Sequence, residues 1–301
     1  MLTRPQKIIL LKLLSLFSVV RGYAIVLMIL AQWLTAAFIL APQTPLIKLF
    51  LSWDLWSLIM ASALSIAAGY IINNFYDQEK DLINRPRRSK LDQMLRQQTK
   101  LSGYFILNFA AVLTASAVSF QAALFFSGFI FLMWYYSHRL KKMIFIGNLT
   151  SALLSVMPLF VLVVYYKSFS SIIVVHACFL LLLLASRELL KDLENLTGDL
   201  VLGYKTIPVV FGVKAAKIVG IALIALTYLP SLILILEYEI DIMQYYFFAT
   251  MLVLPYGAVL LWRAHERRDY LVLHALLRLG IIIGVLSIVL LNPGRLIHGW
   301  A

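Results

Sequence analysis

Three side chains that carry oxygen atoms recur every four residues where an apolar run passes into the longest polar segment: Asn73, Asp77 and Asp81. Offsets of four and eight residues turn a helical position by about 40° and 80°, so these side chains form one stripe if the segment is helical. Carboxylate and amide oxygens are hard ligands that bind cations such as Mg²⁺. The spacing therefore predicts a polar site along one side of a helix.

A second stripe of the same kind occurs in residues 186–199, SRELLKDLENLTGD. On a continuous helix, Glu188, Asp192, Asn195 and Asp199 lie within about 60° of one another. Both stripes follow an apolar run, which indicates a coarse internal repeat. Facing each other, they would present oxygen ligands to Mg²⁺, which typically takes one or two carboxylates together with substrate phosphate oxygens. The two stripes together predict a diphosphate site.

Basic residues around both stripes would complete an anion-binding site. They are Arg85, Arg87, Arg88, Lys141, Lys142, Arg187, Lys191 and Lys205. A simpler interpretation is that each stripe is an ordinary interfacial helix face paired with Lys80, Arg85 or Lys191. Any single basic residue is also explained as a charge of the inner surface. The presence of two matched stripes favours the site.

The composition is that of a membrane protein. Of the 301 residues, 62% are hydrophobic and 13% are charged, whereas a soluble domain carries about a quarter charged residues. We expect nine apolar stretches of about 20 residues to span the membrane. They are 14–40, 54–73, 101–118, 120–137, 147–166, 171–190, 208–236, 245–262 and 273–291. The predicted fold is an all-α membrane protein whose nine transmembrane helices form one bundle around a central cavity open toward the inner face.

The net charge of +12 follows the topology and does not form one patch, so we expect no nucleic-acid partner. Most basic residues lie in alternate connections, which by the positive-inside rule are cytoplasmic. The N-terminus is then predicted to be cytoplasmic and the C-terminus outside, in the inner membrane if the cell is bacterial. Arg21 and Arg278 lie within predicted spans. Because no linker interrupts the chain, residues 1–301 are predicted to form a single domain.

Several motifs, in order along most of the chain, resemble those of the UbiA-type intramembrane prenyltransferases. They are Asn73-x-x-x-Asp77-x-x-x-Asp81 with Asn84-Arg85-Pro86, Tyr136-Ser137-His138-Arg139-Leu140-Lys141, Gly147-Asn148, Arg187 to Glu194, Gly198-Asp199, and Lys205-Thr206-Ile207-Pro208. The segment from Arg187 to Asp199 is most similar to the branch that contains digeranylgeranylglyceryl phosphate synthase, an ether-lipid enzyme.

This resemblance implies an enzyme that uses Mg²⁺ to transfer a polyprenyl group, geranylgeranyl in this branch, from an allylic diphosphate to a lipophilic acceptor. The catalytic residues it implies are Asp77, Asp81, Asp192 and Asp199, which with Asn73 would also hold the metal. The substrate-binding residues it implies are Asn73, Arg85, Tyr136, Lys141, Lys191, Asn195 and Lys205.

The chain departs from the family pattern at Asn195, which stands at the first position of the second Asp-x-x-x-Asp pair. Asp192 and Glu194 lie near enough in the sequence to compensate. Asn74 stands where the family commonly has Asp.

The acceptor favoured by the resemblance is geranylgeranylglyceryl phosphate, whose phosphate would require a second cationic cluster. The run Arg85, Arg87, Arg88 and Lys90 is the candidate for this cluster. One alternative is an aromatic acceptor of a quinone, menaquinone or tetrapyrrole pathway. An alternative of another class is an ion-coupled transporter, but two stripes of the same orientation at inner helix ends favour the enzyme.

Overall fold

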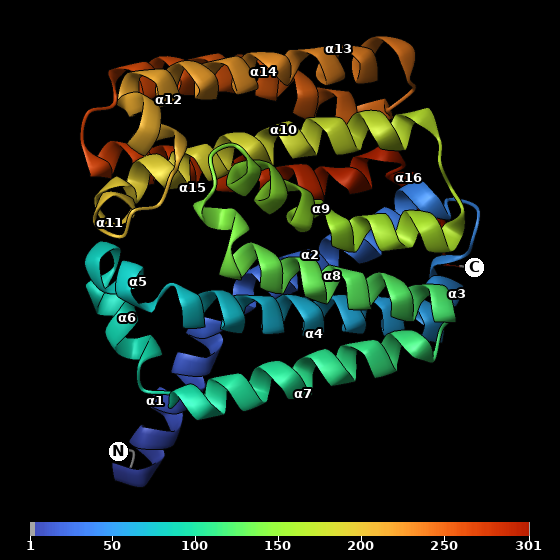
Figure 1. The fold of residues 1–301 in the computed structure, drawn as a ribbon. Coiled ribbons are helices and arrows are strands. Elements are labelled where there is room, and N and C mark those ends of the chain that lie inside the picture. Colours follow the sequence, from blue (N-terminus) through green and yellow to red (C-terminus); the bar gives the residue numbers. More distant parts are fainter. Residues whose placement is uncertain (1–3, 301) are drawn as a thin grey trace.

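The computed structural model describes residues 4–300, which form helices joined by short turns with no strand among them (Figure 1). The longer helices are α1 (Arg4–Val19), α2 (Gly22–Thr35), α4 (Trp53–Tyr76), α7 (Gln97–Ser116), α8 (Phe120–His138), α9 (Ile146–Tyr166), α10 (Ser171–Glu194), α12 (Ile207–Leu226), α13 (Tyr228–Glu237), α14 (Gln244–Arg263) and α15 (Arg267–Ser287). The short helices are η1 (Ala36–Leu40), α3 (Leu46–Phe50), α5 (Gln78–Asn84), α6 (Pro86–Asp92), η2 (Leu140–Lys142), α11 (Leu196–Val201), η3 (Asp241–Met243), η4 (Ile288–Leu291) and α16 (Gly294–His298).

Eight segments of the described chain are long and apolar enough to cross a membrane. They are Gly22–Leu40, Trp53–Tyr76, Phe120–Lys142, Ile146–Tyr166, Ser171–Glu194, Ile207–Glu237, Asp241–Arg263 and Arg267–Leu291. The all-α, multi-pass membrane fold is thereby confirmed. The remaining predicted span, 101–118, corresponds to α7, which is helical and packs along α4 but carries Lys100 and Asn108. The count of nine spans and the cavity open to one face stay predictions.

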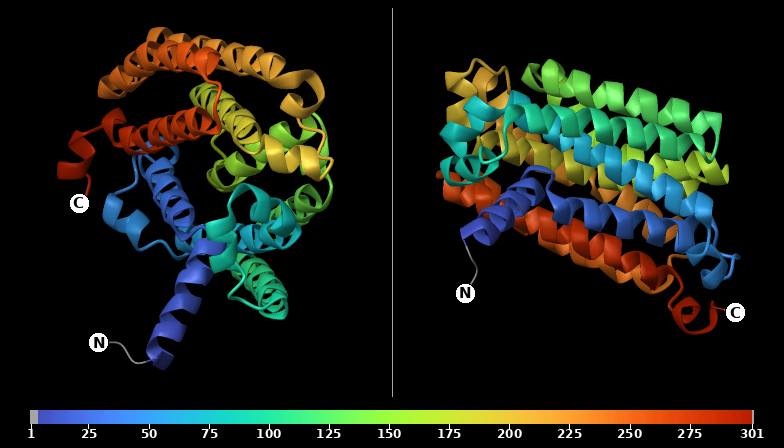
Figure 2. Two further views of the ribbon diagram at one scale, coloured as in Figure 1. Left: turned by 90° about the vertical axis from the view of Figure 1, so that its left-hand side faces the viewer. Right: turned by 90° about the horizontal axis from the view of Figure 1, so that it is seen from below.

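The long helices run roughly parallel and, viewed along their length, surround a common centre (Figure 2). One buried apolar cluster joins α2, α4, α8 and α9, and others join α10 to α12, α14 and α15. The short helices α5, α6 and α11 lie together at one end of the bundle (Figure 1). That end carries both acidic segments.

The first predicted span, 14–40, is divided in two. Residues 14–19 belong to α1, which projects away from the bundle, and the span itself starts at Gly22 (Figures 1 and 2). Arg21 adopts a left-handed conformation with φ of 49°, which ends the first helix. A Cβ atom at Gly22 would lie 2.0 Å from the Phe17 ring, so any larger residue there would displace this exposed ring. Arg21 therefore lies at a helix junction and not within a span as the sequence predicted.

Both acidic segments break at an equivalent residue. Helix α4 ends before Asp77, whose φ and ψ are −95° and 8°, and α5 starts after it. Helix α10 ends before Asn195, at −101° and 10°, and α11 starts after it. Asp and Asn side chains compete for backbone hydrogen bonds and favour helix ends, which explains the residue types at both breaks. The expected continuous helical stripes are thus each bent once, and Asp81 and Asp199 lie on the short helices that follow.

Candidate active site

The first break is joined to the second by the side chain of Asn84. Its Nδ2 donates to the Asn195 carbonyl at 3.3 Å, and its Oδ1 accepts from the Gly198 N–H at 3.1 Å. A Cβ atom at position 198 would lie 2.4 Å from this Nδ2, so the glycine permits the close approach. This contact brings the two acidic segments, more than a hundred residues apart in sequence, to the same place.

Asp77 lies at the centre of a hydrogen-bonded group drawn from three parts of the chain. Its Oδ1 accepts from Lys141 Nζ at 2.6 Å and from the Tyr204 hydroxyl at 3.1 Å, and its Oδ2 accepts from Asn73 at 2.9 Å. Lys141 also donates to Asn73 Oδ1 at 3.3 Å. Burial alone would raise the pKa of Asp77, but the ammonium groups of Lys141 and Lys80 outweigh it, so this pKa lies below its ordinary value. Asp77 is therefore an anion held by both halves of the chain.

Asp81, one helical turn further on, forms no ion pair with any described side chain. Burial and the nearby negative charge of Asp77 raise its pKa above the ordinary value. Arg85, Arg21 and Arg88 oppose this rise, but none of them forms an ion pair with Asp81, so the partly buried carboxylate remains free to bind a metal ion.

The carboxylates of the second segment fall into two groups. Glu188 contacts Lys191 at 2.6 Å and Arg187 at 3.2 Å. Glu194 contacts Arg85 at 2.7 Å and His274 at 2.9 Å, and only 1% of its side chain is exposed. These two glutamates already have cationic partners within the protein, so Glu194 does not supply the compensating ligand suggested by its position in the sequence.

The two aspartates of the second segment are less fully paired. Asp192 accepts a hydrogen bond of 2.7 Å from the neutral amide of Asn148. Asp199 is fully buried and contacts Lys80 at 2.5 Å. Burial outweighs the attraction of Lys80 and leaves the pKa of Asp199 above its ordinary value. Asp192 and Asp199 are therefore the carboxylates of this segment that fit a bound cation.

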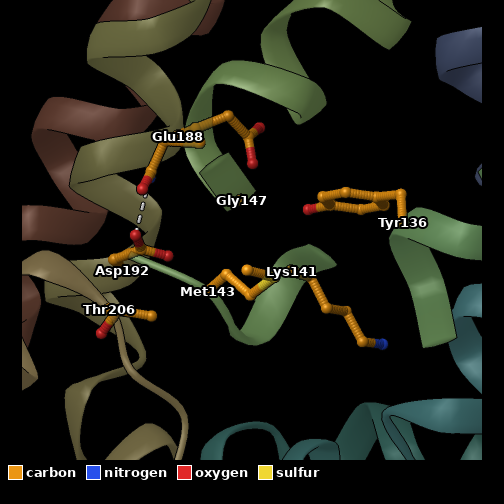
Figure 3. A pocket seen from close by; sticks show the side chains of 8 residues that line it. Tyr136, Lys141, Met143, Gly147, Glu188, Asp192 and Thr206 are labelled. Carbon is orange, nitrogen blue, oxygen red and sulfur yellow. Dashed lines mark hydrogen bonds between the residues drawn. The ribbon is translucent and has the colours of Figure 1, made fainter. Parts of the chain in front are cut away.

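A cleft between α8, α9 and α10 exposes part of this group. Its lining includes Tyr136, Lys141, Asn148, Glu188 and Asp192. Figure 3 shows Tyr136 and Lys141 on one side of this space and Asp192 on the other. The cleft is polar and combines an ammonium group with carboxylates, which is suited to an anion that arrives with a divalent cation.

No three carboxylate, imidazole or thiol side chains in residues 4–300 come close enough together to hold a metal by themselves. Mg²⁺ does not need such a cage, because it commonly binds through one or two carboxylates and takes its other ligands from water and phosphate. The residues present, Asp77 with Asp81 and Asp192 with Asp199, fit that mode of binding.

Four other residues predicted to bind substrate lie away from the hydrogen-bonded group around Asp77. Arg85 and Lys191 contact Glu194 and Glu188 respectively, and Lys205 is exposed, with only its backbone N–H bonded to the Lys142 carbonyl. Asn195 is buried at the helix break. All four lie at the same end of the bundle, but none contacts Asp77 or Asp81 through a side-chain hydrogen bond that the structure describes.

Two residues of the group were absent from the predicted site. Tyr204 bonds to Asp77, and Lys80 contacts Asp199 and lies 4.5 Å from the centre of the Tyr204 ring. Lys80 lies seven residues after Asn73, about two helical turns, so helical spacing could have placed it near the stripe. Tyr204 follows the second break in an irregular turn, where no periodicity predicts its direction.

The fold and the site together define a multi-pass helical membrane protein whose two acidic segments meet at one end of the bundle, beside a polar cleft. The model of the UbiA prenyltransferase family matches residues 29–282, and the chain belongs to this family. It is therefore a prenyltransferase.

Similar curated proteins include two digeranylgeranylglyceryl phosphate synthases. That of Thermococcus sibiricus is 32% identical over 199 residues, which cover 66% of this chain and 68% of the relative. That of Thermococcus gammatolerans is 28% identical over 231 residues, which cover 75% and 81%.

Solved structures show the same fold. A structure described as digeranylgeranylglyceryl phosphate synthase in membranes matches with a TM-score of 0.67 at 19% identity, covering 93% of this chain and 98% of the other. A UbiA homologue from Archaeoglobus fulgidus bound to GPP and Mg²⁺ matches with a TM-score of 0.64 at 16% identity, covering 91% and 99%.

Proposed function

We propose that this protein transfers a geranylgeranyl group from geranylgeranyl diphosphate to the free hydroxyl of geranylgeranylglyceryl phosphate. The bond between the allylic carbon and the diphosphate oxygen breaks, the acceptor oxygen bonds to that carbon, and diphosphate and a proton leave. The observation that carries the proposal is the meeting of Asp77, Lys141 and Tyr204 beside Asp192 and Asp199. The names of the two similar synthases from Thermococcus species support the choice of acceptor.

The metal in this proposal is Mg²⁺, held by Asp77 and Asp81 with Asn73 on one side and by Asp192 and Asp199 on the other. When bound with the donor, it neutralises negative charge that grows on the departing diphosphate. A homologue of the same fold has been solved with GPP and Mg²⁺, which supports this assignment.

The chain's own residues bind and orient the donor. Lys141 donates hydrogen bonds from the edge of the cleft, and its ammonium group can pass from Asp77 to a diphosphate oxygen. Lys191, Asn195, Arg85 and Lys205 supply further donors at the same end of the bundle. Tyr136 lines the cleft, where its aromatic ring would shield an allylic cation. The apolar helices exclude water, which would otherwise hydrolyse an allylic cation.

We propose that the end carrying α5, α6 and α11 faces the cytoplasm, together with the N-terminus, and that residues 1–301 act as a single domain. Residues 1–3 and 301 lie outside those that the structure describes. The basic residues of segment 77–100 support this orientation. An impermeant thiol reagent added to intact cells should fail to label Lys90→Cys or Thr197→Cys in a Cys178→Ser background, because both positions are exposed at that end. Efficient labelling would show that this end faces the outside and would overturn the proposed orientation.

Incubation of the purified protein with geranylgeranyl diphosphate, Mg²⁺ and a panel of acceptors tests the activity. The panel contains geranylgeranylglyceryl phosphate, a hydroxybenzoate, a naphthoate and a porphyrin, and products are identified by mass spectrometry. We expect the phosphorylated glyceryl ether to be prenylated, and a variant carrying both Asp77→Asn and Asp81→Asn to form no product. Preferential prenylation of an aromatic acid would overturn the acceptor assignment. A lack of product from every acceptor would overturn the proposed activity.

A further inference from the structure

A second polar cleft lies on the other side of the first acidic segment. Its lining includes Arg21, Tyr70, Asn73, Asp81, Arg88 and Asp92. It shares no lining residue with the cleft that contains Lys141 and Asp192. The two are nevertheless adjacent, because Asn73 lines the second cleft and accepts a hydrogen bond from Lys141 of the first.

Arg21 supplies this cleft with a positive charge that is attracted by Asp81 and Glu188 but lies in contact with neither. Its guanidinium lies 5.1 Å from the centre of the Tyr70 ring, and within residues 4–300 it forms no ion pair. The residue adopts the left-handed backbone conformation, which is unfavourable for a side chain other than glycine. A strained junction that presents an unpaired guanidinium in a cleft is better explained by a ligand than by packing.

Hydrogen bonds and an ion pair hold Arg88 in the cleft that Arg21 also lines. Its NH2 donates to the Ser18 carbonyl at 2.7 Å, and its Nε lies 3.7 Å from Asp92. Asp92 is 3% exposed and also accepts from Ser18 Oγ at 2.8 Å and from Asn74 Nδ2 at 3.2 Å. Helices α1, α4 and α6 thus fix one side of Arg88. A guanidinium has five N–H donors, so donors remain for a ligand.

Two of the arginines that line the cleft have donors available for an anion. Asp92 is occupied by its contacts within the protein, and Asp81 is assigned above to the metal. Arg85, which also lines the cleft, is paired with Glu194. Arg21 and the free donors of Arg88 therefore remain. Planar guanidinium groups match phosphate oxygens in a bidentate manner, so a phosphate fits them best.

We infer that the cleft between Arg21 and Arg88 binds the phosphate monoester of the acceptor lipid. This inference rests on the proposed function and adds to it the place of the acceptor headgroup. Two highly charged phosphates repel each other and need separate sets of cations. The Lys141 cleft serves the donor diphosphate, and the Arg21–Arg88 cleft serves the acceptor on the other side of Asn73.

The arrangement of the basic loop differs in part from the sequence-based expectation. The run Arg85, Arg87, Arg88 and Lys90 was expected to supply this second cluster, but Arg87 and Lys90 are exposed and line neither cleft. Arg21, some 60 residues earlier in the chain, lines the second cleft in their stead. Arg87 therefore provides a matched control from the same loop.

The test compares Arg21→Gln and Arg88→Gln with Arg87→Gln. For each variant, KM is measured for geranylgeranylglyceryl phosphate and for geranylgeranyl diphosphate. We expect the first two variants to raise the acceptor KM at least about tenfold while the donor KM changes less than about threefold, and Arg87→Gln to change neither. The glyceryl ether without its phosphate should be a poor acceptor for every variant alike. Equal rises in both KM values for Arg21→Gln and Arg88→Gln would overturn the inference.

A binding measurement without donor separates this inference from the proposed function. Titration of geranylgeranylglyceryl phosphate into detergent-solubilised protein, followed by calorimetry, should show at least about tenfold weaker binding to Arg88→Gln, with partial rescue in Arg88→Lys. Inorganic phosphate should compete with the lipid for wild-type protein if the headgroup alone is recognised. Equal lipid affinity of wild type and Arg88→Gln would contradict the inference even if turnover occurs. Weakened binding with no product from any acceptor would retain the site and reject the transfer reaction.

Discussion

The two acidic segments break at equivalent residues but neutralise their charges differently. In the first, Asp77 lies at the break and is contacted by Lys141 and Tyr204 from other parts of the chain. In the second, the break is at Asn195, and the glutamates on either side of Asp192 are taken by cations within the protein. The number of acidic residues in a segment therefore does not give the number of candidate ligands.

This difference distinguishes carboxylates that hold helices together through ion pairs from carboxylates that are available to bind a metal ion. Glu194 is the last residue of α10 and contacts His274 and Arg267 of α15 and Arg85 between α5 and α6, so it links three parts of the chain at this end of the bundle. Asp192 has one neutral hydrogen-bond partner. Removing a buried carboxylate that has cationic partners leaves those cations unpaired, whereas removing a metal ligand mainly affects catalysis. The two kinds of residue can be distinguished by experiment.

The largest effect is expected in the first segment. Asp77→Asn and Asp81→Asn should each lower kcat at least about a thousandfold, equivalent to roughly 4 kcal/mol, because each removes a charged ligand of the metal. Removal of Mg²⁺ by a chelator should have the same effect on the wild type. Initial rates of product formation measure both. Asp54→Asn is the control, since this carboxylate contacts Tyr165 away from both clefts and should keep near-normal rates. Near-normal turnover in either Asp77→Asn or Asp81→Asn would reject the diphosphate site.

The next largest effect is expected at the two aspartates of the second segment. Asp192→Ala and Asp199→Ala should each lower kcat/KM about a hundredfold, equivalent to roughly 2.7 kcal/mol of transition-state stabilisation. Steady-state kinetics at saturating Mg²⁺ check this expectation. If Asp192→Ala were indifferent while Asp199→Ala was inactive, the second segment would supply a single carboxylate.

A smaller effect on activity, but a larger one on stability, is expected at Glu194. Glu194→Gln should destabilise the protein by about 3–5 kcal/mol, because it leaves Arg85 and His274 without their buried partner. The surviving folded protein should keep its kcat within about tenfold and its Mg²⁺ dependence unchanged. Thermal unfolding in detergent and Mg²⁺ activation curves measure the two properties. A normal unfolding temperature combined with a shifted Mg²⁺ curve would make Glu194 a ligand.

The sequence predicts much of this arrangement because its signals are local. Apolar length identifies the spans, and a spacing of four residues places Asn73, Asp77 and Asp81 on one side of a helix. The breaks at Asp77 and Asn195 and the turn at Arg21 depend on backbone conformations that periodicity does not reveal. The pairing of Glu194 with His274 and the contact of Tyr204 with Asp77 join residues at least 80 positions apart, which only the packing of the bundle determines.

The smallest effect tests the residue that distinguishes the two breaks. Asn195→Asp should lower the Mg²⁺ concentration needed for half-maximal activity a few fold, since it adds a negative charge where the first segment has Asp77. The gain should be modest because position 195 is buried and a new carboxylate there loses its hydration. Mg²⁺ activation curves measure the change.

Variants at two positions decide which atom of the second segment binds the metal. If Asp192 is the ligand, Asn195→Ala should be nearly neutral, and Asn195→Asp should partly restore the activity lost in Asp192→Ala, because the added charge replaces the missing one close to the same cleft. If the amide of Asn195 is itself a ligand, Asn195→Ala should be strongly impaired while Asp192→Ala keeps its rate. The second result would mean that the two breaks are equivalent in ligand as well as in backbone, and that the bond from Asn148 to Asp192 serves only to hold α9 against α10.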